Sequence, residues 1–307
     1  MTRLVASEIR RLTSRRLVRR LAVLSLVLIA AGGALAFVRT DSLSEATFQQ
    51  RQAEADQRQA AQDAEISSCL TEHGVARQDE VPDEVARDCF TDPAPAPHDP
   101  RFHRTRLLGI LQGTAGVLVL VGWLIGASMV GAEFASRSMT TTLTWEPRRL
   151  RVIVAKAGVA IAGAALLAAG IVAATTLAML PALLLHGAPV TAAEPSWATL
   201  LGAGLRGTAL AAISCGIGFG IATLARNTGA ALGAGFVYVV VIENILGSSL
   251  AAWRPWLLLG NLIVFVSGHA DADIPGRSVA EAALFLSLVA LAALIAGALS
   301  FRARDVA

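Results

Sequence analysis

Six long apolar segments constrain the fold of this chain more than any other feature. They lie at residues 21–38, 107–131, 151–186, 200–225, 229–250 and 280–301. A helix needs about 20 mostly apolar residues to cross the hydrocarbon core of a bilayer, and each segment is near or above that length. With 54% hydrophobic and 16% charged residues, the composition does not fit a soluble domain. The sequence predicts an all-α polytopic membrane protein with six transmembrane helices.

The arginines predict which ends of these helices face the cytoplasm. Seven of the first 20 residues are arginines, and Glu8 is the one acid among them. Further arginines lie between segments two and three, between four and five, and after six. Because basic segments stay in the cytoplasm, we expect both termini there, with residues 302–307 as a short tail. A signal peptide cleaved near GGALAF is the alternative, and cleavage would remove the first span.

Residues 39–106 form the one large loop expected outside the membrane. The first half is rich in helix-forming residues without glycine or proline, so we expect the first span to continue outward as a helix. Prolines break the second half. Cys69 and Cys89 lie on this oxidising side and are predicted to form a disulfide, with two free thiols as the alternative. The histidines have no spacing typical of zinc ligands, so we expect no metal site.

A seventh apolar piece, residues 256–266, is too short to cross a bilayer. Polar residues follow it and Arg254 precedes it. We therefore expect residues 251–279 to form an outer loop that contains a re-entrant or interfacial helix.

Lys156 is the only lysine in the chain. A P-loop needs a lysine directly after a glycine-rich loop, and no such loop precedes Lys156. Neither a hydrolytic triad nor a metal-ligand cluster appears near either end of the apolar segments. We therefore expect a chain that is not an enzyme, has no catalytic residue, and binds neither a cofactor nor nucleic acid.

Two ionisable residues, Arg206 and Glu243, lie inside predicted spans four and five. An ionisable group in hydrocarbon costs several kcal/mol unless it finds a partner or water. Both positions lie at a similar depth from the outer end, so we expect an intramembrane ion pair, within one subunit or across a dimer. A role in packing and a role in gating or substrate contact both remain open.

The segment 132–150, between spans two and three, is the most informative for function. It combines an acid, a Ser/Thr-rich run, Leu143, Trp145 and a basic cluster around Pro147. This pattern predicts a short amphipathic helix at the membrane face. An ordinary basic loop is the alternative.

This segment resembles the first cytoplasmic connection of bacterial type-2 ATP-binding-cassette (ABC) permeases. The family pattern is matched by Gly131, Glu133, Ser138, Leu143, Pro147, Arg148, Arg149 and Lys156. The TWEPRR run resembles the version found in high-GC actinobacterial members. Arg137 departs from the pattern, because the family often has glycine there, and arginine favours a more continuous helix.

The resemblance implies a permease subunit of an ATP-driven exporter in the bacterial plasma membrane. Such subunits form homodimers or heterodimers and bind two copies of a P-loop ATPase, which holds the ATP and Mg. An amphipathic helix precedes the first span, here residues 1–20, where Val5, Ile9 and Leu12 share a face. The coupling segment would contact the ATPase through Glu133, Phe134, Arg137, Ser138, Leu143, Trp145, Glu146, Pro147, Arg148 and Arg149. A secondary transporter or channel, or a membrane scaffold or sensor, is the alternative.

Overall fold

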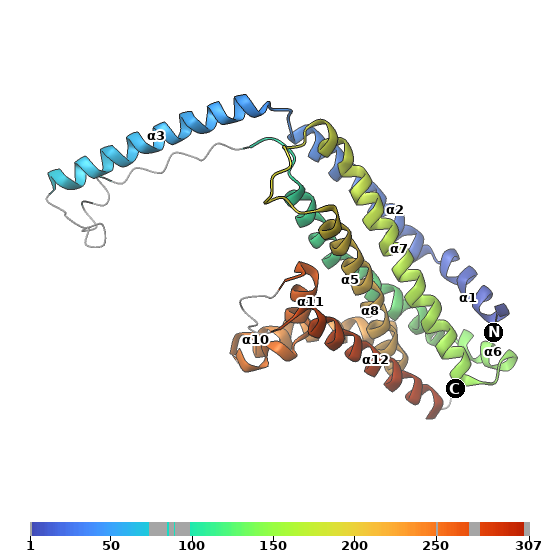
Figure 1. Ribbon diagram of the computed structural model, residues 1–307. Helices are drawn as coiled ribbons and strands as arrows, with labels where there is room; N and C mark the ends of the chain where they lie inside the picture. Colours follow the sequence, from blue (N-terminus) through green and yellow to red (C-terminus); the bar gives the residue numbers. More distant parts are fainter. Residues whose placement is uncertain are drawn as a thin grey trace. The chain divides into compact units, whose positions relative to one another are not determined.

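The computed structural model describes residues 2–73, 85, 89, 99–249, 251–269 and 277–303. The regular elements that it describes are helices (Figure 1). They are α1 (Thr2–Ser14), α2 (Arg16–Arg39), α3 (Glu45–Glu72), α5 (Arg104–Ala135), α6 (Ser138–Trp145), α7 (Arg149–Leu185), α8 (Trp197–Ala225), α9 (Thr228–Val237), the π-helix η2 (Tyr238–Glu243), α10 (Asn244–Ser249), the 3-10 helix η3 (Ala251–Trp256), α11 (Leu258–Ser267) and α12 (Val279–Ala303).

Five of these helices are long and apolar enough to cross a membrane, namely α2, α5, α7, α8 and α12. The predicted fifth span, 229–250, is helical from Thr228 to Ser249 without a gap, but it changes from α-helix (α9) to π-helix (η2) and back to α-helix (α10). Its π-helical part contains the run Val239–Ile242, and four consecutive β-branched residues fit poorly into a regular α-helix. The six-span topology therefore remains a prediction, with five of the six segments confirmed as single helices of spanning length.

The chain divides into two compact units. The first, Met1–Leu35, Arg104–Leu180 and Ala192–Ala307, is the helical bundle, and its main pair is α5 with α8. Gly122 and Gly126 lie four residues apart on α5, and a Cβ at either would overlap the backbone of α8. Small residues at this spacing let two membrane helices approach closely. In the same way, Gly220 of α8 faces the backbone of α12.

The second unit comprises Ala36–His103 and Pro181–Thr191 and contains α3. Contrary to the prediction, the first span does not continue outward, because α2 ends at Arg39 and a new helix starts at Glu45. The Ser44 side chain accepts a hydrogen bond from the Thr47 N–H (3.2 Å) and so caps this new helix. Most of the proline-rich second half of the predicted loop lies outside the described residues.

A disulfide joins Cys69, at the end of α3, to Cys89, as the sequence predicted. His73 Nδ1 lies 3.9 Å from both sulfurs. These three side chains lie close enough to hold a metal ion. The two cysteines are bonded to each other, however, so their thiols are not available as ligands. Near the start of α3, Arg101 contacts Glu45 (2.6 Å) and Asp99 (2.8 Å), and its guanidinium covers the ring of Phe48.

Candidate coupling site

The coupling segment is a short helix between two sharp changes of direction. Helix α5 runs to Ala135, α6 covers Ser138–Trp145, and α7 begins at Arg149. Arg137 adopts a left-handed conformation (φ 56°), which costs a non-glycine residue about 1–2 kcal/mol. The prediction of a more continuous helix at Arg137 is therefore wrong, because the chain bends here with an arginine in the conformation that glycine adopts most readily. Met139 and Thr142 of α6 are buried, so this side of the short helix packs against the bundle.

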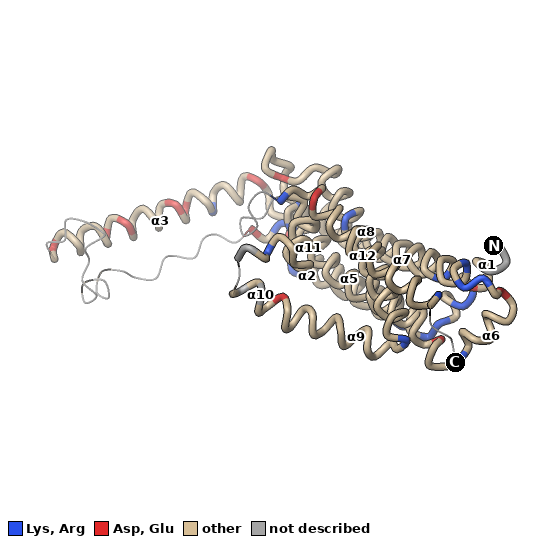
Figure 2. The backbone as a smooth tube through the Cα atoms, turned by 90° about the horizontal axis from the view of Figure 1, so that it is seen from below, with Lys and Arg blue, Asp and Glu red and all other residues tan. Residues whose placement is uncertain are grey.

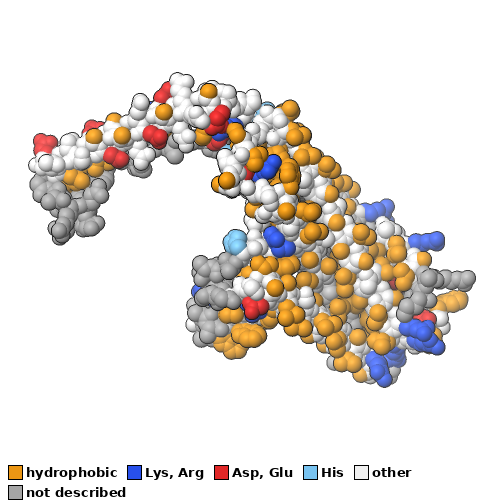
Figure 3. Space-filling model, in the orientation of Figure 1, with side chains coloured by type: hydrophobic (Ala, Val, Ile, Leu, Met, Phe, Trp, Pro, Cys, Tyr) orange, Lys and Arg blue, Asp and Glu red, His pale blue; other side chains and the backbone are white. Residues whose placement is uncertain are grey.

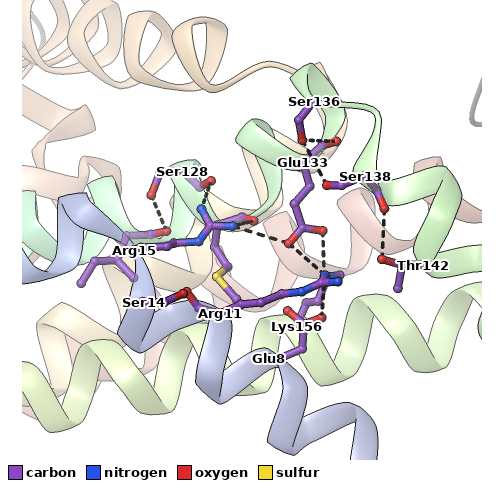
Figure 4. Close-up of polar contacts among 12 residues, drawn as sticks. Glu8, Arg11, Ser14, Arg15, Ser128, Glu133, Ser136, Ser138, Thr142 and Lys156 are labelled. Atoms are coloured by element: carbon purple, nitrogen blue, oxygen red, sulfur yellow. Dashed lines mark hydrogen bonds and ion pairs between the residues drawn. The ribbon is translucent and has the colours of Figure 1, made fainter.

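Lys156, in the third turn of α7, is fully buried. Its Nζ lies 2.7 Å from Glu8 Oε1 of α1 and 2.7 Å from Glu133 Oε2 of α5 (Figure 4). Both carboxylates are buried as well. A buried ammonium is tolerated only when paired, and two carboxylates from different helices provide the partners here. The one lysine of the chain thus joins α1, α5 and α7.

Two arginines extend this group of charges. Arg15 donates hydrogen bonds to the backbone carbonyls of Ser128 (2.7 Å) and Met129 (3.0 Å), and it lies 3.5 Å from Glu133. Burial lowers the pKa of the Arg15 guanidinium, whereas the Glu133 carboxylate opposes that shift. Arg11 lies 3.4 Å from Glu8. We call Glu8, Arg11, Arg15, Glu133 and Lys156 the Lys156 cluster.

The predicted amphipathic helix 1–20 differs from the observed structure in two ways. It is divided, because α1 ends at Ser14 and residues 16–20 belong to α2. Its buried face also differs, since Glu8 and Leu12 are buried while Ile9 is exposed. Glu8 is buried because it pairs with Lys156, and Leu12 packs against Gly163 of α7. The sequence did carry a signal for the Glu8–Lys156 contact. Glu8 is the one acid in a basic helix, and Lys156 is the one lysine in an apolar run.

The predicted coupling residues include one buried residue, several half-buried residues and several exposed residues. Glu133 belongs to the Lys156 cluster, and Phe134 is half-buried, with its ring 6.1 Å from that of Phe301 and beneath the guanidinium of Arg226 (5.7 Å). Ser138, Leu143, Glu146 and Arg149 are half-buried, whereas Arg137, Trp145, Pro147 and Arg148 are exposed.

Helix α6 has one exposed face. Trp145 is 86% exposed. Thr141 and Thr144 are exposed beside it, one turn or less away along the helix. Large aromatic side chains at such exposure are typical anchors of protein interfaces.

Arg206 and Glu243 do not pair with each other in the part of the chain that the structure describes. Arg206 Nε donates to the backbone carbonyl of Val266 (3.4 Å), whereas Glu243 Oε1 accepts a hydrogen bond from the N–H of Leu259 (2.8 Å). The prediction of a direct ion pair within one chain is therefore wrong, and a pair across a dimer remains a prediction.

The two charges bind opposite ends of α11 instead. Glu243, the anion, lies at the first turn of this helix, and Arg206, the cation, lies at its last turn. The helix dipole favours this arrangement of charges. Tyr238 and Gln112 add to this arrangement, because the Leu258 N–H donates to the Tyr238 hydroxyl (3.2 Å) and Gln112 donates to the Ser267 carbonyl (3.3 Å). We call Gln112, Arg206, Tyr238 and Glu243 the α11 clamp. The predicted short helix of residues 251–279 is thus present, fixed at both ends.

Comparison with known proteins gives a family for the chain. The family model described as ABC-2 family transporter protein matches residues 9–306. No curated protein and no solved structure matches the chain significantly.

Proposed function

Since the chain belongs to the ABC-2 family of transporter proteins, we propose that it is the permease subunit of an ATP-driven exporter, working with a separate P-loop ATPase. The chain would form the translocation pathway in the bacterial plasma membrane as a dimer, either with a second copy of itself or with a second, different permease. Each would bind one ATPase subunit, which holds the ATP and Mg. Residues 132–150 would carry the motion of that ATPase into the membrane helices.

The observation that carries this proposal is the attachment of α6 to the bundle. Helix α6 follows directly on α5 and leads into α7, and the Lys156 cluster fastens these two helices to each other and to α1. A rigid-body motion in a soluble partner reaches the membrane helices only through a stiff element. A helix whose two neighbours are joined by buried charges meets that requirement, while a loosely held loop does not.

The contact with the ATPase would be made by the exposed face of α6, with Trp145 at its centre. Buried Glu133 and half-buried Phe134 would act from behind this face by holding α6 in position. Loss of an aromatic anchor at the centre of an interface commonly costs 2 kcal/mol or more, which is about a 30-fold loss of affinity.

The test is whether the tagged full chain, purified from the membranes of its own organism, retains a P-loop ATPase. We expect the wild type to retain the ATPase, Trp145→Ala to lose most of it, and Trp253→Ala to retain it. Trp253 is a matched control, because it is an exposed tryptophan in η3, far from α6 in sequence. Failure of the wild type to retain any P-loop ATPase would overturn the proposed function and favour a secondary transporter, channel or scaffold. Equal retention by both variants would overturn the role of α6 alone.

A further inference from the structure

Phe134 touches two other parts of the bundle just before α6 begins. Its ring lies 6.1 Å from that of Phe301 of α12, in an edge-to-face arrangement, and the guanidinium of Arg226 lies 5.7 Å from its centre. Phe301 is buried near the end of α12. Arg226 forms the turn between α8 and α9, where its backbone is left-handed (φ 53°). We call Phe134, Arg226 and Phe301 the Phe134 triad; it ties the coupling segment to the α8–α9 turn and to α12.

Helix α9 begins in close contact with this end of α5. A Cβ at Gly131 of α5 would lie 2.6 Å from the backbone nitrogen of Thr228. Two turns further along α9, a Cβ at Gly235 would lie 2.7 Å from the ring of Trp123 of α5. Ala231, between these contacts, is fully buried. Packing this tight has little room to compress, so the first two turns of α9 follow movements of α5.

The far end of the same helical stretch holds α11. Helix α9 continues without a gap into η2, and Figure 2 shows it running from the end of the bundle that holds α6 toward α10. Tyr238 and Glu243 of η2 accept hydrogen bonds from the first turn of α11. The stretch from α9 to η2 therefore connects the coupling segment with the α11 clamp.

We propose that Phe134 is a positioning residue that passes a movement of α6 to α9 through Arg226. This inference rests on the proposed function, in which a partner ATPase moves α6. The end of α5 moves with α6, and the Phe134 ring then displaces the Arg226 guanidinium that it contacts. Arg226 lies two residues before Thr228, so the displacement reaches the first turn of α9. Contiguous packed side chains of this kind carry coupling between distant sites.

A second triad of the same kind, on other elements, provides a matched control. The guanidinium of Arg277 lies 5.4 Å from the centre of the Phe285 ring, and the Trp256 ring meets Phe285 edge-on at 6.3 Å. Phe285 is half-buried, as Phe134 is. It lies in the second turn of α12, whereas Phe301 lies near the end of that helix. A substitution at Phe285 therefore removes the same kinds of contact without touching the coupling segment.

The experiment measures hydrogen exchange at residues 226–231 by mass spectrometry, in the complex of the tagged full chain with the ATPase that it retains. The complex is measured without nucleotide and after trapping with ATP, Mg and vanadate. Asn227, Gly229 and Ala230 are exposed, so amides in this stretch can reach water. Figure 3 shows Lys and Arg side chains gathered at the end of the bundle that holds α6, and hydrophobic side chains over much of the rest.

We expect exchange at residues 226–231 to differ by about fivefold or more between the two states of the wild-type complex, the lower end of typical coupling between sites. Phe134→Leu keeps an apolar side chain but lacks the ring, and the difference should fall below about twofold. Phe134→Tyr keeps the ring and should restore it, and Phe285→Leu should respond as the wild type does. An equal response in Phe134→Leu and the wild type would show direct contact of the ATPase with the turn and overturn the role of Phe134.

Arg226→Gln covers the case in which Phe134→Leu does not fold or does not retain the ATPase. It removes the guanidinium from the other side of the same contact, and Arg277→Gln is its control. We expect the response to fall in Arg226→Gln and to persist in Arg277→Gln; a full response in Arg226→Gln would overturn transfer through this turn. A wild-type complex that retains the ATPase but shows no response at residues 226–231 overturns this inference alone. A chain that retains no P-loop ATPase overturns the proposed function.

Discussion

The Lys156 cluster and the α11 clamp both hold a buried carboxylate of the bundle, but they use different partners. In the Lys156 cluster, side chains on α1, α5 and α7 pair with one another. In the α11 clamp, Glu243 and Arg206 each bind backbone atoms at one end of α11. The first arrangement joins three elements through mutual charges, whereas the second positions one short helix.

Because the partners differ, mutations in the Lys156 cluster and in the α11 clamp should affect stability in different ways. Removing one member of a buried ion pair leaves the other charge uncompensated, so the members of the Lys156 cluster depend on each other. A backbone N–H or carbonyl that loses a side-chain partner stays neutral, so each half of the α11 clamp acts almost alone. The predictions below test this distinction, beginning with the largest expected effect.

Replacing Lys156 with methionine should have the largest effect. The substitution leaves the buried Glu8 and Glu133 without their shared cation, and such a loss costs about 3–5 kcal/mol. We expect a strongly lowered thermal unfolding midpoint of the purified full chain in detergent, and loss of ATPase co-purification with it.

A triple variant tests whether Glu8 and Glu133 depend on Lys156. Adding Glu8→Gln and Glu133→Gln to Lys156→Met should recover part of the lost stability, because two buried carboxylates that keep only the longer contacts to Arg11 and Arg15 are then gone. Arg10→Met, which removes an exposed charge from α1, is the control and should stay within about 0.5 kcal/mol of the wild type. A Lys156→Met protein as stable as this control would contradict the cluster.

Replacing Glu243 with methionine should have the next largest effect. The Leu259 N–H then loses the buried carboxylate that accepts its hydrogen bond (2.8 Å), at a cost of about 1–3 kcal/mol. We expect faster hydrogen exchange at the first turn of α11 and little change at α6. Glu243→Gln keeps an acceptor and should lie between methionine and the wild type.

A double-mutant cycle then decides between the clamp and the ion pair that the sequence predicted. If Arg206 and Glu243 act on opposite ends of α11, the effects of Arg206→Met and Glu243→Met on unfolding should add within about 0.5 kcal/mol. A coupling well above 1 kcal/mol would instead indicate that the two charges meet, for example across a dimer.

The same contrast explains what could be predicted from the sequence. Apolar segments and a pair of cysteines in one polar loop are local signals, and they located five helices long and apolar enough to span a membrane and the Cys69–Cys89 disulfide. The Lys156 cluster depends on contacts between residues 148 positions apart, such as Lys156 with Glu8, which no local pattern encodes. The α11 clamp could not be predicted for another reason, because the partners of Glu243 and Arg206 are backbone groups at the ends of a helix, and these do not depend on residue type.

A third group of charges, in the second unit, gives a smaller and pH-dependent effect. Hydrogen bonds from Arg101 hold the pKa of Asp99 below its usual range. This stabilisation is complete above the ordinary Asp pKa of about 4 and is lost as the pH falls through the lower folded pKa. Asp99→Asn should therefore lower the free energy of unfolding at pH 7 by up to about 1 kcal/mol, and by progressively less below pH 4.

The control for this pH effect is Asp56→Asn, an exposed position in the middle of α3. It should change the unfolding midpoint little at either pH. A loss for Asp99→Asn that is the same at pH 7 and pH 3 would point to packing instead of charge.

The smallest effect is expected at Arg137, where the bend before α6 has a left-handed backbone. Glycine relieves a strain of about 1–2 kcal/mol but also gives the unfolded chain more freedom, worth about 0.4–1 kcal/mol. Arg137→Gly should therefore raise the unfolding midpoint slightly, whereas Arg10→Gly, inside α1, should lower it.

The gain at Arg137 should itself depend on the Lys156 cluster, because Glu133, four residues earlier, fixes the end of α5. In a Lys156→Met background the chain around Arg137 can relax out of the left-handed conformation, so glycine should no longer stabilise it. A gain that persists unchanged in that background would show that the bend is set by α6 alone. The buried charges would then hold α1 against the bundle without shaping the segment that follows α5.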